Sequence, residues 1–422
     1  MEGRANLLAW LTMIAIAIGV AGYADYRPAG NADIVHYIAT VHYWEGATGS
    51  DLRAKTYGDL QAFLSDDQYL DVTGMAGDPT INRNVYLRAI EADPEALRQQ
   101  LPFYSVKPLY PALMAGLGLV GLSLGQASVL ISAVCYFLTA LLIFAWFRRH
   151  LGPWSSLLLG ALVVLSAPFW MVARLSTPDA LALLIHVAGL FVLLELRRPG
   201  LALAILIAAI LARPNAVLTV LAVVAVVSVA SRSSGIRLDR RLAVLGAVCG
   251  VALAASLSLW SGNYGLYTLF YHAVIAYLEY PVLGAPDLSL AEIGRVYLFR
   301  FVALSASPVP AFLLLGILAI RARVATPRAI LDDGPSLVVL GMFASMAMTW
   351  LTYPNEPERI LVGMFLVITI VLGYSVAPVV TAALAHVTGR QATLHPVPEN
   401  PDPDPTLEPG PGAVAQGAPA RS

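Results

Sequence analysis

LLAWLTMIAIAIGV (residues 7–20) is an uninterrupted apolar run, and GNADIVHYIATVHYWEG (residues 30–46) follows soon after it. Crossing the hydrocarbon core of a bilayer takes about 20 mostly apolar helical residues, so the first stretch predicts a transmembrane helix. If the second stretch is helical, Asp33, His36 and Tyr37 share one face, because they are three and four positions apart. A carboxylate among polar aromatic residues at a membrane surface predicts either a general base or a helix cap.

The amino-acid composition is typical of a membrane protein and not of a soluble one. Of the 422 residues 58% are hydrophobic and 13% charged, whereas soluble domains have about 45–50% apolar and about 25% charged residues. We therefore expect an all-α polytopic membrane protein. The formal net charge of −1 and the lack of a basic, aromatic-interleaved patch argue against a nucleic-acid partner. Cys135 and Cys249 both lie in apolar runs, which argues against a disulfide framework or a thiolate metal site.

The apolar segments predict a bundle of about ten transmembrane helices. The candidate spans are 7–23, 126–147, 154–172, 180–195, 241–261, 297–320, 336–352 and 359–382, with two short passes in 200–231 that are broken at Arg213-Pro214. Residues 1–24 resemble a signal peptide in having Arg4 before an apolar core. The length of that core and the many later spans favour a retained first helix.

Arginine clusters orient the spans, because cytoplasmic loops carry an excess of Lys and Arg. The clusters are Arg148 and Arg149, Arg197 and Arg198, the run 231–241, and Arg321, Arg323 and Arg328. All of them lie inside only if PLYPALMAGLGLVGL (108–122) does not cross. Both termini are then cytoplasmic, and the long loop 24–125, with its juxtamembrane helices, is extracytoplasmic. Residues 390–422 are proline-rich and predict a disordered cytoplasmic tail.

With this orientation, the scattered ionisable residues come to one side of the membrane. They are Asp33, Lys107, Arg174, Asp179, Arg213, Glu356, Glu358 and Arg359. An Arg or Lys at a helix centre costs about 2.5–3.5 kcal/mol on insertion scales, so several charges at one level predict a functional site. Structural alternatives stay open: Asp33 as a cap, Lys107 as an interfacial lysine, Asp179 as a first-turn acid of a helix, and an ion pair between Glu358 and Arg359.

Several kinds of site are not indicated. His36 and His42 are six positions apart, and neither HExxH nor CxxC occurs, so a zinc site is not expected. The chain has no P-loop and no GxSxG motif, so we expect neither nucleotide hydrolysis nor a serine hydrolase elbow.

Six short motifs occur in a defined order along residues 5–385. They are Asp33 and Tyr37 as D-x3-Y, KPLYP (107–111), RRHLG (148–152), TPDAL (177–181), ARP (212–214) and PER (357–359). This order resembles the GT-C superfamily of integral membrane glycosyltransferases, which includes the protein O-mannosyltransferases and the lipid A aminoarabinose transferases. The resemblance implies a GT-C-like transmembrane domain over residues 1–389 and a hexosyl or pentosyl transferase of the bacterial cytoplasmic membrane.

The resemblance also implies substrates and residue roles. A polyprenyl-phosphate-linked sugar would be the donor, and an envelope glycan, lipid or protein the acceptor, on the extracytoplasmic side. Asp33 would be the base that activates the acceptor. Lys107, with Arg213 and Arg174, would hold the phosphate, and Asp179 would be a second acid beside the cavity. Apart from the resemblance, we expect His36 and Tyr37 either to line the same pocket or to pack against the outer-loop helices, and we expect Glu358 and Arg359 to contact the substrate.

Two positions depart from the pattern of some relatives. Ala32 and Val106 stand where those relatives carry a further acid, so no acidic pair supports a bound divalent cation. A single base predicts inversion at the anomeric carbon. The alternative is a transporter or flippase for an amphiphilic lipid-linked substrate, which the helix break at Arg213-Pro214 would suit. A non-catalytic scaffold is a third interpretation, and it needs no converging charges.

The orientation can be tested by cysteine labelling with a membrane-impermeant reagent. Cysteines placed at positions 107 and 179 are expected to react from outside, and one at position 235 only after the inner face is opened. Labelling of position 235 in intact cells would contradict the orientation and would separate the proposed cluster.

Overall fold

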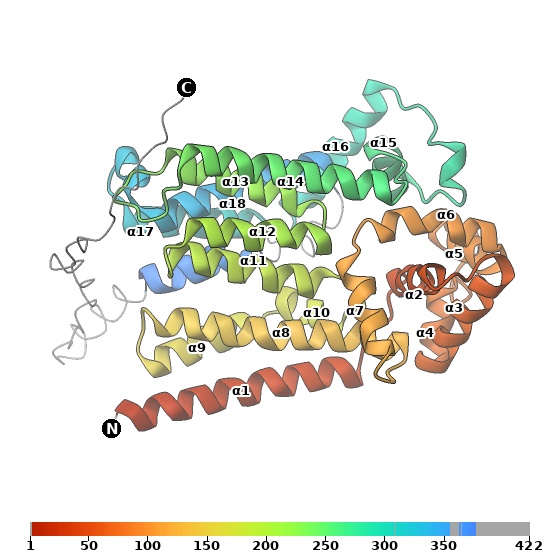
Figure 1. Cartoon of the computed structure of the whole chain (residues 1–422), viewed down its shortest axis with the longest axis horizontal. Coiled ribbons are helices and arrows are strands. Elements are labelled where there is room, and N and C mark those ends of the chain that lie inside the picture. The colour runs from red at the N-terminus through yellow and green to blue at the C-terminus, as the bar shows by residue number, and fades with distance from the viewer. Residues whose placement is uncertain (1, 308, 355–362, 364, 377–422) are drawn as a thin grey trace, which may run out of the picture. The chain divides into compact units, whose positions relative to one another are not determined.

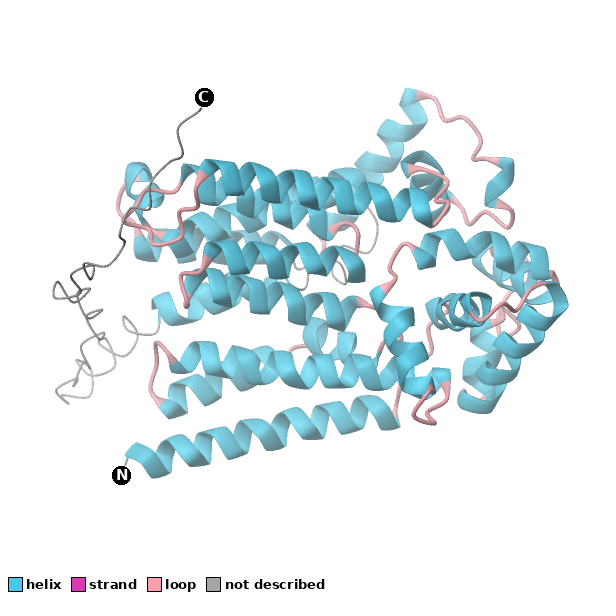
Figure 2. Cartoon of the chain, in the orientation of Figure 1, coloured by secondary structure: helices cyan, strands magenta, loops and turns pink. Residues whose placement is uncertain are grey.

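The computed structural model describes residues 2–307, 309–354, 363 and 365–376. In that part of the chain every regular element is a helix, as Figure 2 shows, and the one pairing of extended backbone is an isolated bridge between Ala29 and Leu175. The prediction of an all-α protein is confirmed for these residues. Three predicted site residues and the predicted tail lie outside the described residues: Glu356, Glu358, Arg359 and 390–422.

The first predicted outer loop is almost entirely helical. Its helices are α2 (Asp33–Trp44), α3 (Gly49–Phe63), α4 (Asp66–Val72), α5 (Asn82–Ala92), α6 (Pro94–Ser105) and α7 (Leu109–Gly118). α2 packs against α3, α6 and α7, so the helix that begins at Asp33 is the centre of this group. Figure 1 shows α2 to α6 grouped at one end of the longer helices.

The remaining α-helices are mostly apolar, and most of them pack into a bundle. They are α1 (Glu2–Tyr26), α8 (Leu124–Arg148), α9 (Pro153–Val164), α10 (Ala167–Arg174), α11 (Asp179–Leu194), α12 (Pro199–Ala212), α13 (Ala216–Val229), α14 (Arg240–Trp260), α15 (Leu266–Phe270), α16 (Leu290–Ser305), α17 (Val309–Arg323) and α18 (Gly334–Thr352). α8 packs between α1 and α11, and α11, α12 and α13 follow one another side by side (Figure 1). A π-helical turn, Tyr271–Ile275, continues directly from α15.

Four of these helices are long and apolar enough to cross a bilayer: α1 from Gly3 onward, α8, α14 and α18. Two bent pairs, α9 with α10 at 62° and α16 with α17 at 65°, raise the number to six if each pair is one span. α11, α12 and α13 are apolar but have only 16, 14 and 14 residues. The described residues thus support a helical membrane protein with four to six spans, and a total of about ten stays a prediction.

The break between α12 and α13 falls at the predicted dipeptide. Arg213 has an extended backbone, with φ −149° and ψ 113°, directly before Pro214. A residue before proline is disfavoured in the α conformation because the proline ring clashes with its backbone. α12 therefore ends at Ala212, and α13 begins at Ala216 after one turn.

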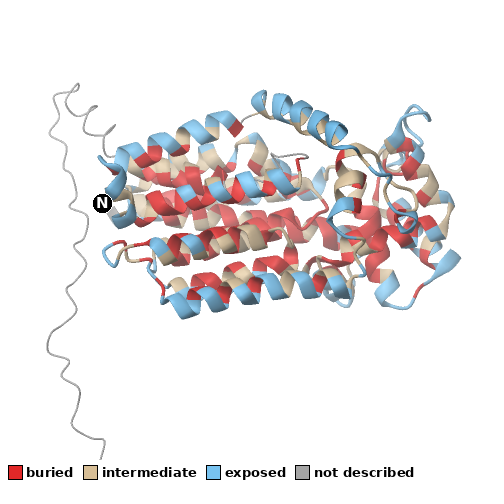
Figure 3. Ribbon diagram, turned by 90° about the horizontal axis from the view of Figure 1, so that it is seen from above, coloured by how far each residue is buried: buried red, intermediate tan, exposed pale blue. Residues whose placement is uncertain are grey.

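Burial gives most of these apolar helices an inner and an outer face (Figure 3), whereas α16 has no buried residue. On α1, Ala9, Met13 and Ala17 are fully buried at four-residue spacing, while Leu8 and Leu11 are exposed. α1 packs against α8, α9 and α10. Small residues at helix contacts are typical of membrane bundles, and apolar side chains on the outer face suit lipid.

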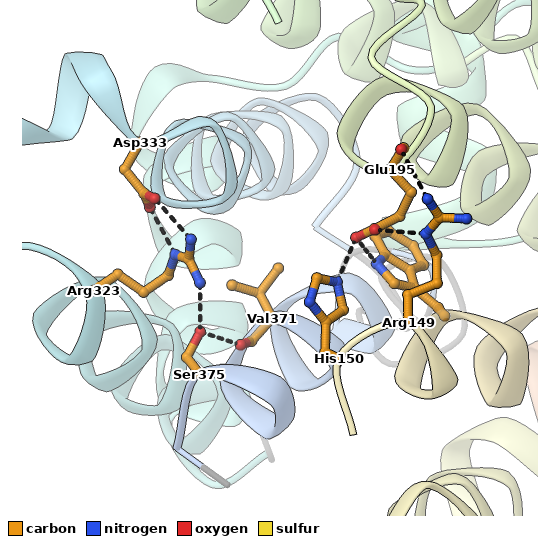
Figure 4. A network of polar contacts seen from close by, with 8 residues as sticks. Arg149, His150, Glu195, Arg323, Asp333, Val371 and Ser375 are labelled. Carbon is orange, nitrogen blue, oxygen red and sulfur yellow. Dashed lines mark hydrogen bonds and ion pairs between the residues drawn. The ribbon is translucent and has the colours of Figure 1, made fainter. Parts of the chain in front are cut away.

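A polar network closes the bundle end that the arginine clusters predict to be cytoplasmic (Figure 4). Its centre is Glu195, whose side chain is 8% exposed. Trp146 Nε1 donates to one Glu195 oxygen at 2.6 Å, and Arg149 and His150 lie at 3.1 and 2.8 Å from the carboxylate. A buried carboxylate is tolerated when charges and donors surround it in this way. The network joins the ends of α8 and α11.

A close contact between α8 and α3 gives a test of the fold. A Cβ added to Gly125 would lie 2.4 Å from Cγ of Phe63, so the ring would have to move. We expect Gly125→Ala to destabilise the protein by about 1–3 kcal/mol through overpacking. The matched control is Gly116→Ala in α7, where nothing lies within 4 Å of the added Cβ. There we expect a gain of up to about 1 kcal/mol from helix propensity.

Thermal unfolding of the two variants in lipid nanodiscs measures the difference. A fall in Tm for Gly116→Ala as large as that for Gly125→Ala would contradict the contact between α3 and α8.

Candidate active site

A cavity of about 370 Å³ lies where the α6–α7 junction and the α12–α13 turn meet α14, α15 and the end of α18. Lys107 and Arg213, predicted from separate motifs, both line it. Much of the remaining wall is apolar and includes Leu218, Leu266 and Phe270. A cavity with two cationic side chains and apolar walls suits a ligand that has an anionic group and an apolar part.

Lys107 is held over aromatic rings. It lies between the end of α6 and the start of α7, directly before Pro108. Its ammonium donates to the Tyr37 hydroxyl at 3.2 Å and lies 4.9 Å from the centre of the Tyr104 ring and 5.6 Å from that of Tyr37. Cation–π contacts are favourable by about 0.5–2 kcal/mol, depending on desolvation. These contacts place the ammonium at the cavity wall.

Asp33 is the first residue of α2 and lies in its first turn. Its carboxylate accepts a hydrogen bond from the Tyr104 hydroxyl at 3.1 Å. A negative charge at a helix N-terminus is also favoured by the helix dipole. Asp33 is not among the residues that line the cavity, but it and Lys107 contact the same tyrosine.

His36 lies behind this tyrosine rather than in the cavity. Its Nδ1 is 3.2 Å from the Ala32 carbonyl, its Nε2 is 2.9 Å from the Tyr86 hydroxyl, and its ring stacks on Tyr104 at 4.2 Å. Burial lowers the pKa of His36 to about 3, so the ring is neutral. Nδ1–H then donates to the carbonyl, and Nε2 accepts from Tyr86. His36 therefore supports Tyr104.

Tyr37 also supports the site. Its ring packs edge-on against Tyr104 at 5.1 Å and against Tyr110 at 4.9 Å, and it is almost fully buried. With the hydroxyl accepting from Lys107, this buried ring fixes the direction of the ammonium.

Arg213 forms an ion pair with Asp179. Its Nη1 lies 2.7 Å from Oδ1 of Asp179, and the two side chains are 16% and 2% exposed. Oδ2 of Asp179 accepts from the Thr177 hydroxyl at 2.8 Å. Asp179 is the first residue of α11 and does not line the cavity, so its effect on a ligand passes through Arg213.

Arg174 is not at the cavity. Its Nε donates to the Arg27 carbonyl at 2.7 Å, and its guanidinium lies over the rings of Tyr23 and Trp170 at 5.5 and 5.2 Å. The backbone of Ala29 in turn donates to the Arg174 carbonyl at 2.9 Å. These bonds attach the segment between α1 and α2 to the end of α10, and they fix where α2 begins.

Sequence reasoning missed Tyr104, although it stands three positions before Lys107 in FYSVKP. The two residues are joined by a turn in which the Lys107 N–H donates to the Tyr104 carbonyl at 3.1 Å, and helical spacing alone does not predict this. Sequence reasoning also missed Asn215 and Asn263, which line the cavity. Among the described residues, no group of three or more His, Cys, Asp or Glu side chains could hold a metal ion.

Two cations, Lys107 and Arg213, line a largely apolar cavity, and Tyr104 connects Lys107 to the Asp33 carboxylate outside its lining. Such a set can accept a proton at one point and stabilise an anion at another. Comparisons with protein-family models, with curated proteins and with solved structures give no match to this chain.

Buried neutral histidines make stability depend on pH. Burial lowers the pKa of His36 to about 3 and that of His272 to about 4, below the usual 6.5. Below pH 6.5 the unfolded chain binds protons that the folded chain does not, so stability falls as pH decreases toward these values. The loss approaches about 1.4 kcal/mol per pH unit for each histidine.

We expect His36→Gln to reduce this pH dependence, because glutamine does not titrate. Tm measured between pH 7 and pH 4 should fall less steeply in the variant than in the parent protein. His272→Gln is the companion variant and should act in the same direction. Equal slopes in all three proteins would show that these histidines are not buried in neutral form.

Proposed function

We propose that this protein is a glycosyltransferase that moves a sugar from a polyprenyl phosphate to an envelope acceptor on the extracytoplasmic face of the membrane, with inversion. The observation that carries the proposal is that Lys107 and Arg213 line one largely apolar cavity while Asp33 lies one tyrosine away. The GT-C resemblance of the motifs supports the same class. The acceptor is a glycan, a lipid or a protein.

The two cations suit the leaving group of this reaction. When the bond between the anomeric carbon and the phosphate oxygen breaks, the singly charged phosphodiester becomes a lipid phosphate monoester with a second negative charge. Lys107 and Arg213 line the largely apolar cavity and would stabilise that charge there. Removal of one oxyanion donor from comparable sites reduces the rate by about 10²–10³-fold.

Asp33 suits the role of base. Its carboxylate would accept the proton of an acceptor hydroxyl as that oxygen attacks the anomeric carbon from the face opposite the phosphate. A positioned base contributes about 10²–10⁴-fold to such a step. The glycosyl phosphate is already activated, so the reaction requires no nucleotide site.

A transporter or flippase is the second candidate, and one observation favours it. The cavity lies at a break between two apolar helices, with the extended backbone of Arg213 at the break. Discontinuous helices with charged residues are found at transporter binding sites. The two functions differ in product, because a transporter moves the lipid-linked sugar without cleaving the glycosyl phosphate bond.

Turnover by purified protein in lipid vesicles tests the proposal. Radiolabelled polyprenyl-phosphate sugars serve as donors and envelope extract as acceptor. We expect Asp33→Asn to reduce transfer by about 10²–10⁴-fold, and Lys107→Gln or Arg213→Gln by about 10²-fold or more. Lys55→Gln is the matched control, since Lys55 is the other lysine of the chain and pairs with Asp51 in α3 at 3.0 Å.

The outcomes separate the candidates. Transfer that survives in Asp33→Asn keeps the enzyme class and rejects this base. A product that retains the anomeric configuration of the donor rejects the single-base displacement. Movement of an intact donor across the vesicle without transfer supports the transporter instead.

A further inference from the structure

Tyr104 lies at the centre of the candidate site, and neither a motif nor the proposed mechanism includes it. It comes from the last turns of α6, three positions before Lys107. Its hydroxyl donates to Oδ1 of Asp33 at 3.1 Å, and the Lys107 ammonium lies 4.9 Å from the centre of its ring. One side chain therefore contacts both the proposed base and one of the proposed phosphate-holding cations.

The ring of Tyr104 is fixed by its neighbours on α2. The His36 ring stacks on it at 4.2 Å with an interplanar angle of 4°, and the Tyr37 ring meets it edge-on at 5.1 Å. His36 is in turn held by the Ala32 carbonyl and the Tyr86 hydroxyl. The orientation of Tyr104 is thus determined by several buried groups and not by one contact.

We infer that Tyr104 is a positioning residue that holds the Asp33 carboxylate and the Lys107 ammonium in one fixed arrangement. This inference rests on the proposed glycosyl transfer. In an inverting displacement the attacking and leaving oxygens lie on opposite faces of the anomeric carbon, so the base and the phosphate-holding cation must keep a constant relation to each other. A rigid side chain in contact with both provides that relation.

The hydroxyl acts on Asp33 and the ring acts on Lys107. Burial is the main cause that raises the pKa of Tyr104 well above its usual value, so the hydroxyl stays protonated and donates throughout the working pH range. A donor to a carboxylate favours its charged form, which is the form that a base requires. The ring face attracts the ammonium independently of the hydroxyl.

This division of roles makes Tyr104→Phe an informative variant. The change keeps the ring under Lys107 and against His36 and removes only the bond to Asp33. We expect kcat to fall about tenfold or more, as for loss of a hydrogen bond to a charged group. The acidic limb of the kcat/KM profile should move to higher pH, while KM for the polyprenyl-phosphate sugar stays within about twofold, because the ring contact to Lys107 is kept.

Two further variants separate the contacts. Tyr37→Phe removes the hydroxyl that accepts from Lys107, so it should raise KM for the donor without moving the acidic limb. Tyr86→Phe is the matched control: it removes a hydroxyl from the far side of the same stack, where the partner is His36. It should lower Tm and leave the acidic limb unchanged.

A second test uses non-additivity. In the Asp33→Asn background, Tyr104→Phe should cause little further loss, because both changes remove one interaction. Full additivity would overturn the inference. A Tyr104→Phe protein with the parent rate and pH profile would also overturn the inference. If Tyr104→Leu then loses activity, the ring serves packing alone.

These results also separate the inference from the function it rests on. If the parent protein transfers no sugar from any donor, the proposed function and the inference fail together. If the parent transfers sugar and Tyr104→Phe is indistinguishable from it, only the inference fails.

Discussion

The arrangement of the site depends on the ion pair between Arg213 and Asp179, because a cation in apolar surroundings needs an opposite charge close to it. Arg213 is 16% exposed at an apolar cavity, and its pairing at 2.7 Å with the buried Asp179 makes that position tolerable. Removing charge from water costs several kcal/mol per ion, which only close pairing and hydrogen bonds offset. Asp179 meets this need because it begins α11 and because Thr177 donates to its second oxygen. The same pair fixes the cation that faces the cavity.

Asp33 is positioned by hydrogen bonds between the segment before α2 and the end of α10. The segment before α2 is bonded to the end of α10 through the Arg174 carbonyl and guanidinium and through the Ala29 and Arg27 backbone. α2 therefore begins at a set place beside α6, and Asp33 meets the Tyr104 hydroxyl there. Arg174 thus serves the site from outside the cavity.

Local sequence rules predicted much of this and missed what depends on packing. The extended backbone of Arg213 follows from Pro214 alone, and the face shared by Asp33, His36 and Tyr37 follows from helical spacing. The burial of His36 and the attachment made by Arg174 depend on partners distant in the chain, which spacing does not specify. The number of spans does not follow from helix length either, because α12 and α13 have 14 residues and a straight span needs about 20.

The helix break and the cavity belong together for a physical reason. Backbone that is not helical is tolerated at membrane depth only where it is buried in protein or lines a polar cavity, because lipid cannot satisfy its hydrogen-bonding groups. The turn from Arg213 to Asn215 lines the cavity, and the side chains of Arg213 and Asn215 are among its polar residues. Arg213, the residue before Pro214, thus follows the end of α12 and lines the cavity. Its guanidinium pairs with Asp179 at the start of α11. The dipeptide Arg213-Pro214 therefore determines both where the helix breaks and which cation lines the cavity there.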